Sequence, residues 1–249
     1  MTRILLLGHG RMGQLVESLA PSYGATIAGV IDERSGERAI ADGDFGDVDV
    51  AVDFTLAEAV VKNLPQLAAR KINVVIGTTG WQSHEAAMRE LVERTRIGVL
   101  AASNFSLGMN VFQMAVEEAS RRFANHAEFG AWIHEAHHTM KKDAPSGTAL
   151  TLGRAAAEGR GQKLHDVAAL SRQGMSPRQA GEIGFSVIRG GDIVGDHSVM
   201  FAGTAERIIL VHQATDRSIF ARGALQGAAW LAEQPPGRYT MRDVIAFKT

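Results

Sequence analysis

The sequence predicts an α/β protein: a doubly wound parallel sheet of the Rossmann type, together with a second domain of mixed helices and strands. Two observations predict the first part. Apolar, strand-forming segments alternate with helical patterns through residues 1–102, and a glycine-rich turn follows the first of these segments. A third observation predicts the second domain, because several strand-like segments after residue 184 are joined by glycine-containing turns.

The expected strands of the first domain are almost continuously apolar, as in a sheet that is covered on both faces. They are residues 4–7, 26–32, 48–55, 73–76 and 98–102. Helices are expected from residue 14 to 19, from 56 to 70 and from 84 to 96. Pro65 lies inside the second of these helices and is expected to kink it.

The regular alternation stops after Ser106. A helix is expected over residues 110–123, followed by a strand over 127–135 that ends just before a histidine pair. Residues 185–188, 197–201 and 207–213 have strand patterns, which predict an antiparallel or mixed sheet, and residues 218–231 form a closing helix. Residues 159–181 are rich in Gly, Arg and Gln and are expected to be loop.

Composition excludes several functional classes. The 249 residues carry 26 Lys and Arg against 27 Asp and Glu, with a net charge of −1, so the charge expected of a nucleic-acid binder is missing. Since the chain has no cysteine, disulfides, thiolate nucleophiles and cysteine-bound metals are excluded. No segment approaches a membrane span, and Gly8 interrupts the first apolar run, so we expect a soluble cytoplasmic protein.

The glycine-rich turn is Gly8-His9-Gly10-Arg11-Met12-Gly13, which lies between a strand and a helix. Glycines in this pattern allow a dinucleotide pyrophosphate to approach the backbone at a helix N-terminus. Asp32 ends the second strand, where an acid accepts hydrogen bonds from the adenosine ribose. Glu33 would repel a 2′-phosphate and Arg34 would attract one, so NADH is only modestly favoured over NADPH.

Two further loops follow expected strands of the same sheet. They are Gly77-Thr78-Thr79-Gly80 and Ala102-Ser103-Asn104-Phe105-Ser106. Ligands of doubly wound sheets bind beyond the carboxyl ends of the strands, so small and hydroxyl residues here suit a nicotinamide ring and its ribose. Asn104 is a candidate partner for the carboxamide.

The segment from His137 to Leu150 concentrates chemistry in a short stretch. Two adjacent imidazoles, His137 and His138, titrate near neutral pH, and Lys141 and Lys142 add fixed positive charge. Pro145-Ser146-Gly147-Thr148 is typical of a loop that enters a helix, where free N–H groups and hydroxyls bind a carboxylate or phosphate. A basic surface turn with two solvated histidines is the alternative.

His134-Glu135-Ala136-His137-His138 also matches the H-E-x-x-H signature of zinc peptidases. That motif requires a helix, on which residues four apart share a face. In the strand expected here, His134 and His138 would stand roughly 13 Å apart at about 3.3 Å per residue. We therefore expect no metal, and the peptidase remains an unfavoured alternative.

The chain resembles the 4-hydroxy-tetrahydrodipicolinate reductases, also called dihydrodipicolinate reductases, of bacterial lysine and diaminopimelate synthesis. The motifs that carry the resemblance run in order along the chain. They are residues 10–13, 52–55, 77–80, 104–110, 135–138, 141–149 and 189–195. Departures are a glycine loop one residue shorter than the commoner form, and Glu33 where some members carry Arg, so cofactor preference stays open.

The resemblance implies a dinucleotide-binding domain of residues 1–106 and 217–249, and a substrate-binding domain of residues 107–216 whose sheet builds a homotetramer. It implies His137 as the general acid and Lys141 as the catalytic lysine. The implied substrate contacts are His138, Lys141, Ser146, Gly147 and Thr148. From the glycine-rich turn, Asp32 and the strand-end loops, the expected cofactor contacts are Gly8, His9, Gly10, Arg11, Met12, Gly13, Asp32, Phe54, Thr55, Gly77, Thr78, Thr79, Ala102, Ser103, Asn104 and Phe105.

The expected reaction is the reduction of 4-hydroxy-2,3,4,5-tetrahydrodipicolinate by NADH or NADPH, with loss of water, to tetrahydrodipicolinate. A hydride added at C4 of a conjugated cyclic imine makes an enamine-like anion, which His137 would protonate while Lys141 stabilises charge. Another Rossmann oxidoreductase or a catalytically silent cofactor sensor is the alternative. A sensor has no need of an acid, a lysine and an anion site together.

Overall fold

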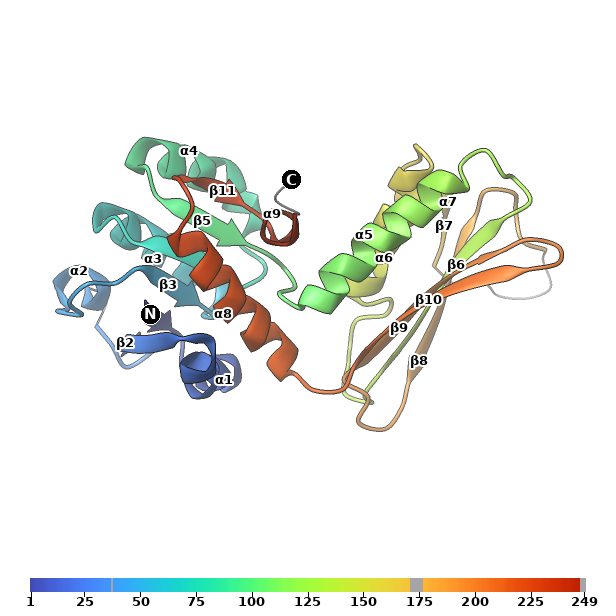
Figure 1. The fold of residues 1–249 in the computed structure, drawn as a ribbon. Coiled ribbons are helices and arrows are strands. Elements are labelled where there is room, and N and C mark those ends of the chain that lie inside the picture. Colours follow the sequence, from blue (N-terminus) through green and yellow to red (C-terminus); the bar gives the residue numbers. More distant parts are fainter. Residues whose placement is uncertain (37, 171–176, 247–249) are drawn as a thin grey trace. The chain divides into compact units, whose positions relative to one another are not determined.

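The computed structural model describes residues 1–36, 38–170 and 177–246. The chain divides into two compact units, one of Met1–Leu107 with Ser218–Thr249 and the other of Gly108–Arg217 (Figure 1).

The first unit contains a six-stranded sheet in the order β11-β5-β4-β3-β1-β2. Its strands are β1 (Thr2–Leu7), β2 (Ala25–Ile31), β3 (Val50–Asp53), β4 (Asn73–Ile76), β5 (Gly98–Ala101) and β11 (Gly237–Tyr239). Every pairing is parallel, and Leu7, Asp53 and Ile76 are successive register partners. The loops that follow β1, β3 and β4 therefore meet at one edge, and the predicted Rossmann-type sheet is confirmed.

Helices cover both faces of this sheet (Figure 1). They are α1 (Arg11–Leu19), α2 (Ala39–Asp42), α3 (Ala57–Ala69), α4 (Glu85–Thr95), α8 (Ser218–Ala232) and α9 (Met241–Ile245), with 3-10 turns at Ala20–Tyr23 and Gln82–His84. Leu5 and Leu7 pack with α3 and α4, whereas Ile4 and Leu6 pack with α1 and α8. Burial on both faces explains why the strands read as continuous apolar runs. Pro65 lies inside α3.

The second unit contains a five-stranded mixed sheet in the order β10-β9-β6-β8-β7. Its strands are β6 (Gly130–His137), β7 (Ala168–Ala169), β8 (Ile183–Arg189), β9 (Gly195–Ala202) and β10 (Arg207–Ala214). β6 is parallel to β8 and antiparallel to β9. The helices are α5 (Leu107–Arg122), α6 (Gly147–Gly159) and α7 (Leu164–Val167), and α5 and α6 cover one face of the sheet through a shared apolar core.

The structure differs from the sequence-based expectation at several places. β6 runs to His137 rather than ending at residue 135, so the first histidine of the pair belongs to the strand. The expected loop 159–181 contains α7 and β7, because Leu164 packs into the core beside Gly153; its residues 171–176 lie outside the described part of the chain. β11 and α9 were not predicted, since segments of three and five residues carry little periodicity.

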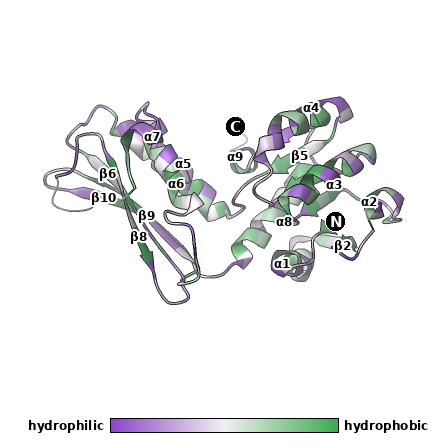
Figure 2. Cartoon of the chain, turned by 180° about the vertical axis from the view of Figure 1, so that it is seen from behind, coloured by the Kyte–Doolittle hydropathy of each residue, from purple (hydrophilic) through white to green (hydrophobic). Residues whose placement is uncertain are grey.

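The helices of the first unit are amphipathic. Figure 2 shows hydrophilic and hydrophobic residues mixed along α4, in which Met88 and Val92 are buried. Among the described residues, every helix is too short or too polar to cross a membrane.

Candidate active site

In the glycine turn after β1, two positions have no room for any side chain. Gly8 has φ of +86°, and a Cβ placed there would lie 2.8 Å from the carbonyl oxygen of Phe54. A Cβ on Gly13 would lie 2.0 Å from the carbonyl oxygen of Gly8, so glycine is required for α1 to begin against the turn. A Cβ on Gly10 meets no atom within 4 Å, which leaves its surroundings open for a ligand.

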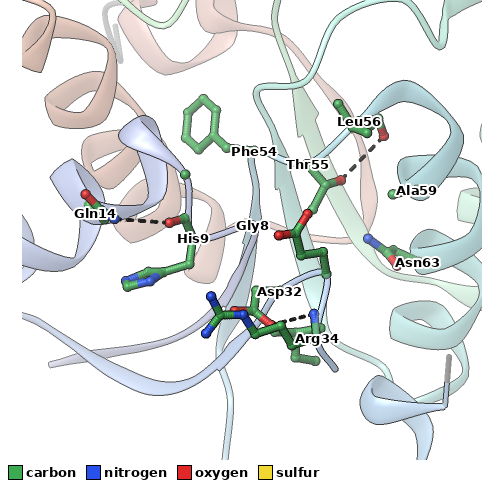
Figure 3. A pocket seen from close by; sticks show the side chains of 13 residues that line it. Gly8, His9, Gln14, Asp32, Arg34, Phe54, Thr55, Leu56, Ala59 and Asn63 are labelled. Carbon is green, nitrogen blue, oxygen red and sulfur yellow. Dashed lines mark hydrogen bonds between the residues drawn. The ribbon is translucent and has the colours of Figure 1, made fainter. Parts of the chain in front are cut away.

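This turn borders a cavity of about 590 Å³ (Figure 3). Gly8, His9, Gly10, Asp32, Glu33, Arg34, Phe54 and Thr55 are among the residues that line it. The side chains of Asp32 and Arg34 lie together in Figure 3, and Oδ1 of Asp32 accepts the backbone N–H of Arg34 at 2.9 Å. A second cavity of about 280 Å³ is lined by Met12, Phe54, Thr55, Leu56, Ala57, Gly77, Thr78 and Thr79.

Asp53, at the end of β3, ties two of these loops together. Its carboxylate is buried and accepts hydrogen bonds from the backbone N–H of Thr55 at 2.9 Å, from Asn63 at 3.1 Å and from the hydroxyl of Thr78 at 3.3 Å. Burial raises the pKa of Asp53, and these hydrogen bonds act against that rise. The loops after β3 and β4 are thus fixed to each other by one carboxylate.

The remaining predicted cofactor residues lie around these cavities rather than in their linings. Arg11 and Gly13 belong to the first turn of α1. Residues 102–105 follow β5 at the same edge of the sheet, where Oδ1 of Asn104 accepts the backbone N–H of Ser106 at 2.9 Å. Phe105 is buried in the core with its ring edge-on to Phe54, at a centroid distance of 6.3 Å.

In the second unit, β6 delivers His137 to the start of the loop that carries Lys141. The backbone N–H of His138 donates to the carbonyl of Ile193 at 2.7 Å, which anchors the loop beside the β8–β9 connection. Lys141 forms an ion pair with Asp143, and an electrostatic contribution from the backbone N–H of Gly147 also stabilises the carboxylate of Asp143. The side chain of Lys141 therefore lies close to the N-terminus of α6.

The N-terminus of α6 has the features that the sequence predicted for an anion site. Ser146 is the N-cap residue, and its hydroxyl accepts the backbone N–H of Ala149 at 3.1 Å. Gly147 is exposed, and a Cβ at this position would meet no atom within 4 Å. The first N–H groups of a helix have no partner within the helix, and the positive end of the helix dipole lies at this open position. The predicted residues Ser146, Gly147 and Thr148 are thus adjacent at one helix start, three to five residues beyond Asp143.

A buried cluster surrounds His137. Oε2 of Glu135 lies 3.6 Å from Nδ1 of His137 and 3.6 Å from Nε2 of His197 on β9. Oε1 of the same carboxylate accepts hydrogen bonds from Arg189 on β8 at 2.9 Å and from the backbone N–H of Ser146 at 3.0 Å. On the other edge of the His137 ring, Nε2 lies 3.1 Å from the position that a Cβ on Gly195 would take.

The cluster sets the charge states of its members. Burial lowers the pKa of His137 to about 4; Glu135 opposes this shift, and His197, Arg189 and Lys141 add to it. Burial also opposes ionisation of Glu135, but the polar contacts with His197, Ser146 and Arg189 outweigh it and hold the pKa of Glu135 well below its usual range. Without a ligand, a neutral imidazole therefore lies beside a carboxylate anion at neutral pH.

Sequence reasoning missed four residues of this site: Glu135, Arg189, His197 and Arg217. Arg217 donates a hydrogen bond to Nε2 of His138 at 3.3 Å. Glu135 and Arg189 belong to motifs that carry the family resemblance, but neither received a role. One sequence pattern could have identified Glu135 and Arg189: each is a charged residue in a strand whose other inward-facing residues are apolar.

The H-E-x-x-H match lies on strand β6 and the residue after it, not on a helix, so the geometry of a zinc peptidase is absent from this segment. His134 bonds the hydroxyl of Ser186 at 2.6 Å, and His138 bonds Arg217. Glu135, His137 and His197 do bring three potential ligand atoms within 4.8 Å of one another. Arg189 and the N–H of Ser146 already neutralise the carboxylate of this group.

Comparison with known proteins identifies the family. Residues 2–105 match the model for the N-terminal domain of dihydrodipicolinate reductase, and residues 108–245 match the model for its C-terminal domain. The chain belongs to the dihydrodipicolinate reductase family. Among its relatives, the 4-hydroxy-tetrahydrodipicolinate reductase of Zymomonas mobilis is 43% identical over 98% of this chain and 96% of that protein. The Caulobacter vibrioides reductase is 42% identical over 96% of this chain and 95% of that protein.

Solved structures show the same fold. The dipicolinate-bound dihydrodipicolinate reductase from Paenisporosarcina sp. TG-14 has a TM-score of 0.74 at 20% identity, covering 99% of this chain and 100% of that one. A probable dehydrogenase from Thermotoga maritima has a TM-score of 0.60 at 11% identity, covering 97% and 92%. The resemblance to this reductase family that the sequence motifs suggested is confirmed.

Proposed function

We propose that this member of the dihydrodipicolinate reductase family reduces 4-hydroxy-2,3,4,5-tetrahydrodipicolinate with NADH or NADPH, with loss of water, in diaminopimelate and lysine biosynthesis. The proposal rests mainly on the chemical groups that lie close together between His137 and Thr148. One strand end, one loop and one helix start bring together an imidazole, an ammonium group and an anion site. These are the groups that the reduction of a dicarboxylate requires.

The first unit supplies the residues for a nicotinamide dinucleotide. A pyrophosphate fits at the N-terminus of α1, because Gly8 and Gly13 allow the tight turn and Gly10 leaves space beside the backbone. Asp32 would hold the adenosine ribose, and Thr55, Thr78 and Thr79 line the second cavity, toward the nicotinamide end. The bound cofactor supplies a hydride. Ala102, Ser103, Asn104 and Phe105 complete the proposed set at the edge of the sheet.

Cofactor preference follows from charge at the ribose end of the larger cavity. Asp32 and Glu33 place two carboxylates there against the single guanidinium of Arg34. A 2′-phosphate would add further negative charge, so we expect NADH to be used at least as well as NADPH.

The second unit supplies the residues for the substrate. Lys141 and the N–H groups of Gly147 and Thr148 would hold one carboxylate, and His138 and Ser146 complete the proposed contacts. The dipicolinate bound to the Paenisporosarcina reductase is a dicarboxylate of the same ring size as the proposed substrate. In the unliganded chain, Asp143 supplies the carboxylate that pairs with Lys141.

His137 would supply the proton that quenches the anion formed by reduction. Its neutral state without a ligand agrees with this role, because two substrate carboxylates would bring negative charge to the loop and favour the imidazolium. Nε2 faces away from Glu135 toward Gly195, so Nε2 is the atom placed to donate.

The sheet of the second unit also supports a homotetramer. Ile188, Ile208, Ile209 and Val211 are large apolar side chains on β8 and β10 that are exposed in the single chain. Apolar residues gathered on strands in this way commonly mark a protein interface. We propose that other copies of the chain cover these four side chains in a homotetramer.

We also propose that the enzyme works in the cytoplasm, where its cofactor is available.

The test is turnover. The purified protein should oxidise NADH and NADPH only when the tetrahydrodipicolinate precursor is supplied, and tetrahydrodipicolinate should form in equal amount. Absence of oxidation with either cofactor, in a sample that binds NADH, would leave a cofactor-binding sensor instead.

A further inference from the structure

Arg189 and Glu135 together bond strand β6, the loop of Lys141 and the start of α6. We propose that these two residues form a positioning pair: Arg189 holds the loop of Lys141 against the sheet, and Glu135 fixes the ring of His137 with Nδ1 protonated and Nε2 free to exchange a proton with substrate. This inference deepens the proposed function and rests on it.

Arg189 on β8 joins strand β6 to the loop of Lys141 through three hydrogen bonds. Nη2 donates to Oε1 of Glu135 at 2.9 Å and to the carbonyl oxygen of Asp143 at 2.5 Å, while Nε donates to the carbonyl oxygen of Lys141 at 3.3 Å. The loop is thus held at Lys141 itself and at the residue that pairs with it. A planar guanidinium provides several fixed donor directions at once, which an ammonium group cannot replace.

The two carboxylate oxygens of Glu135 face different groups: Oε1 contacts Arg189 and the start of α6, and Oε2 faces the imidazole ring of His137. Oε1 receives Arg189 and the N–H of Ser146, so it fixes the start of α6. Within the described part of the chain, Oε2 has no hydrogen-bond partner within 3.5 Å, and neither has Nδ1 of His137, although both atoms are buried and 3.6 Å apart. Buried polar atoms without partners are costly, and catalytic hydrogen bonds are often long before substrate binds. Nε2 of His197 is equally close to Oε2, but it already bonds the hydroxyl of Ser146 at 3.3 Å. Nδ1 of His137 is therefore the partner that we assign to Oε2 in the working enzyme.

The charged and titratable groups that face His137 come from four places. They are Glu135 on its own strand, His197 on β9, Arg189 on β8 and Lys141 in the loop. Glu135 favours the imidazolium and the other three oppose it. Removing Glu135 and removing Arg189 should therefore shift the titration of His137 in opposite directions, which an ion pair remote from the ring would not do.

Three variants test the pair: Glu135→Gln, Arg189→Met and Arg189→Lys. Titration of His137 is followed by NMR of ¹⁵N-labelled imidazole with saturating pyridine-2,6-dicarboxylate, and the signal is assigned with His137→Gln. Relative to wild type, Glu135→Gln should lower the pH at which His137 titrates by about 1 unit, and Arg189→Met should raise it by about 1 unit. In the wild type, the neutral ring should carry its proton on Nδ1.

Arg189→Lys separates charge from geometry. It keeps the positive charge, so the titration should remain close to that of wild type, but it loses the directed bonds to the loop carbonyls. Its dissociation constant for pyridine-2,6-dicarboxylate, measured by calorimetry, should rise by about tenfold. Where reductase activity is present, turnover in Glu135→Gln should fall off at a lower pH than in wild type, because the protonated acid is lost earlier as pH rises.

Matched controls come from another ion pair. Arg238 and Glu85 in the first unit are 3.0 Å apart, and Glu85→Gln and Arg238→Met should change neither His137 titration nor dicarboxylate binding. Shifts of the same sign in Glu135→Gln and Arg189→Met, shifts no larger than in the controls, or wild-type binding by Arg189→Lys would overturn the positioning role. If Glu135→Gln does not fold, the positioning role is tested by His137 titration in Arg189→Met and by dicarboxylate binding in Arg189→Lys. Titration and binding need no turnover, so loss of the proposed reaction would be seen separately.

Discussion

The backbone N–H of Ser146 donates a hydrogen bond of 3.0 Å to Oε1 of Glu135, eleven residues earlier in the chain. This bond joins the N-cap of α6 to strand β6 at the residue two before His137. It fixes the proposed anion site relative to the proposed proton donor. The intervening loop therefore presents Lys141 from two anchored ends.

Loss of either proposed catalytic group should impair chemistry and leave cofactor binding intact. His137→Ala and Lys141→Ala are each expected to lower kcat by roughly 10²-fold or more, because acid catalysis and charge stabilisation each contribute about that much. Steady-state kinetics and NADH titration by fluorescence measure the two effects. Lys142→Ala, which changes an exposed neighbouring lysine, is the control and should behave like wild type. Wild-type turnover in both active-site variants would remove these residues from the mechanism.

Gly10 should tolerate a methyl group in the free protein but not in the complex with cofactor. Among the described residues, no atom apart from those of its chain neighbours lies within 4 Å of its Cβ position, so Gly10→Ala should keep the thermal stability of wild type. A pyrophosphate close to this backbone would meet the added methyl, and NADH affinity should fall by about tenfold or more. Gly36→Ala, also at an open position, should change neither quantity. Unchanged NADH binding in Gly10→Ala would move the pyrophosphate away from this turn.

Asp143 should compete with the carboxylate of the ligand. The Lys141–Asp143 ion pair is partly exposed, so breaking it costs at most about 1 kcal/mol. Asp143→Asn is therefore expected to tighten binding of pyridine-2,6-dicarboxylate by up to about fivefold in calorimetry. Asp166→Asn, another exposed carboxylate in the same unit, serves as the control. Weaker binding in Asp143→Asn would mean that Asp143 orients Lys141 for the ligand instead.

Reductase activity should not depend on a metal. Glu135, His137 and His197 offer donor atoms for a cation, but Arg189 would oppose its positive charge beside the same carboxylate. Protein dialysed against a strong chelator should keep full activity, and elemental analysis should find no stoichiometric zinc. Activity that is lost to the chelator and restored by zinc would place a metal at these three residues and contradict the positioning role of the Arg189–Glu135 pair.

Local sequence was sufficient for much of the fold. The strands of the first sheet were predictable because burial on both faces makes each one apolar throughout, and the turn at Gly8 follows from close packing against Phe54. Elements as short as β11 were not predictable, since their place depends on pairing with β5.

The proposed site was predictable only where its residues are adjacent in the chain. Ser146, Gly147 and Thr148 lie at one helix start and carry a local capping signal. The link between Glu135 and Arg189 spans 54 residues and depends on the pairing of β6 with β8. His197 reaches the same carboxylate through the pairing of β6 with β9. Register between distant strands leaves no such local signal.

The most direct test of the account is the fate of the cofactor's hydride. NADH labelled with deuterium at the transferred position should be incubated with the enzyme and 4-hydroxy-tetrahydrodipicolinate, and the product analysed by NMR and mass spectrometry. The account predicts one deuterium in each product molecule, located at C4. Oxidation of NADH without deuterium at that carbon, or no oxidation at all, would contradict it.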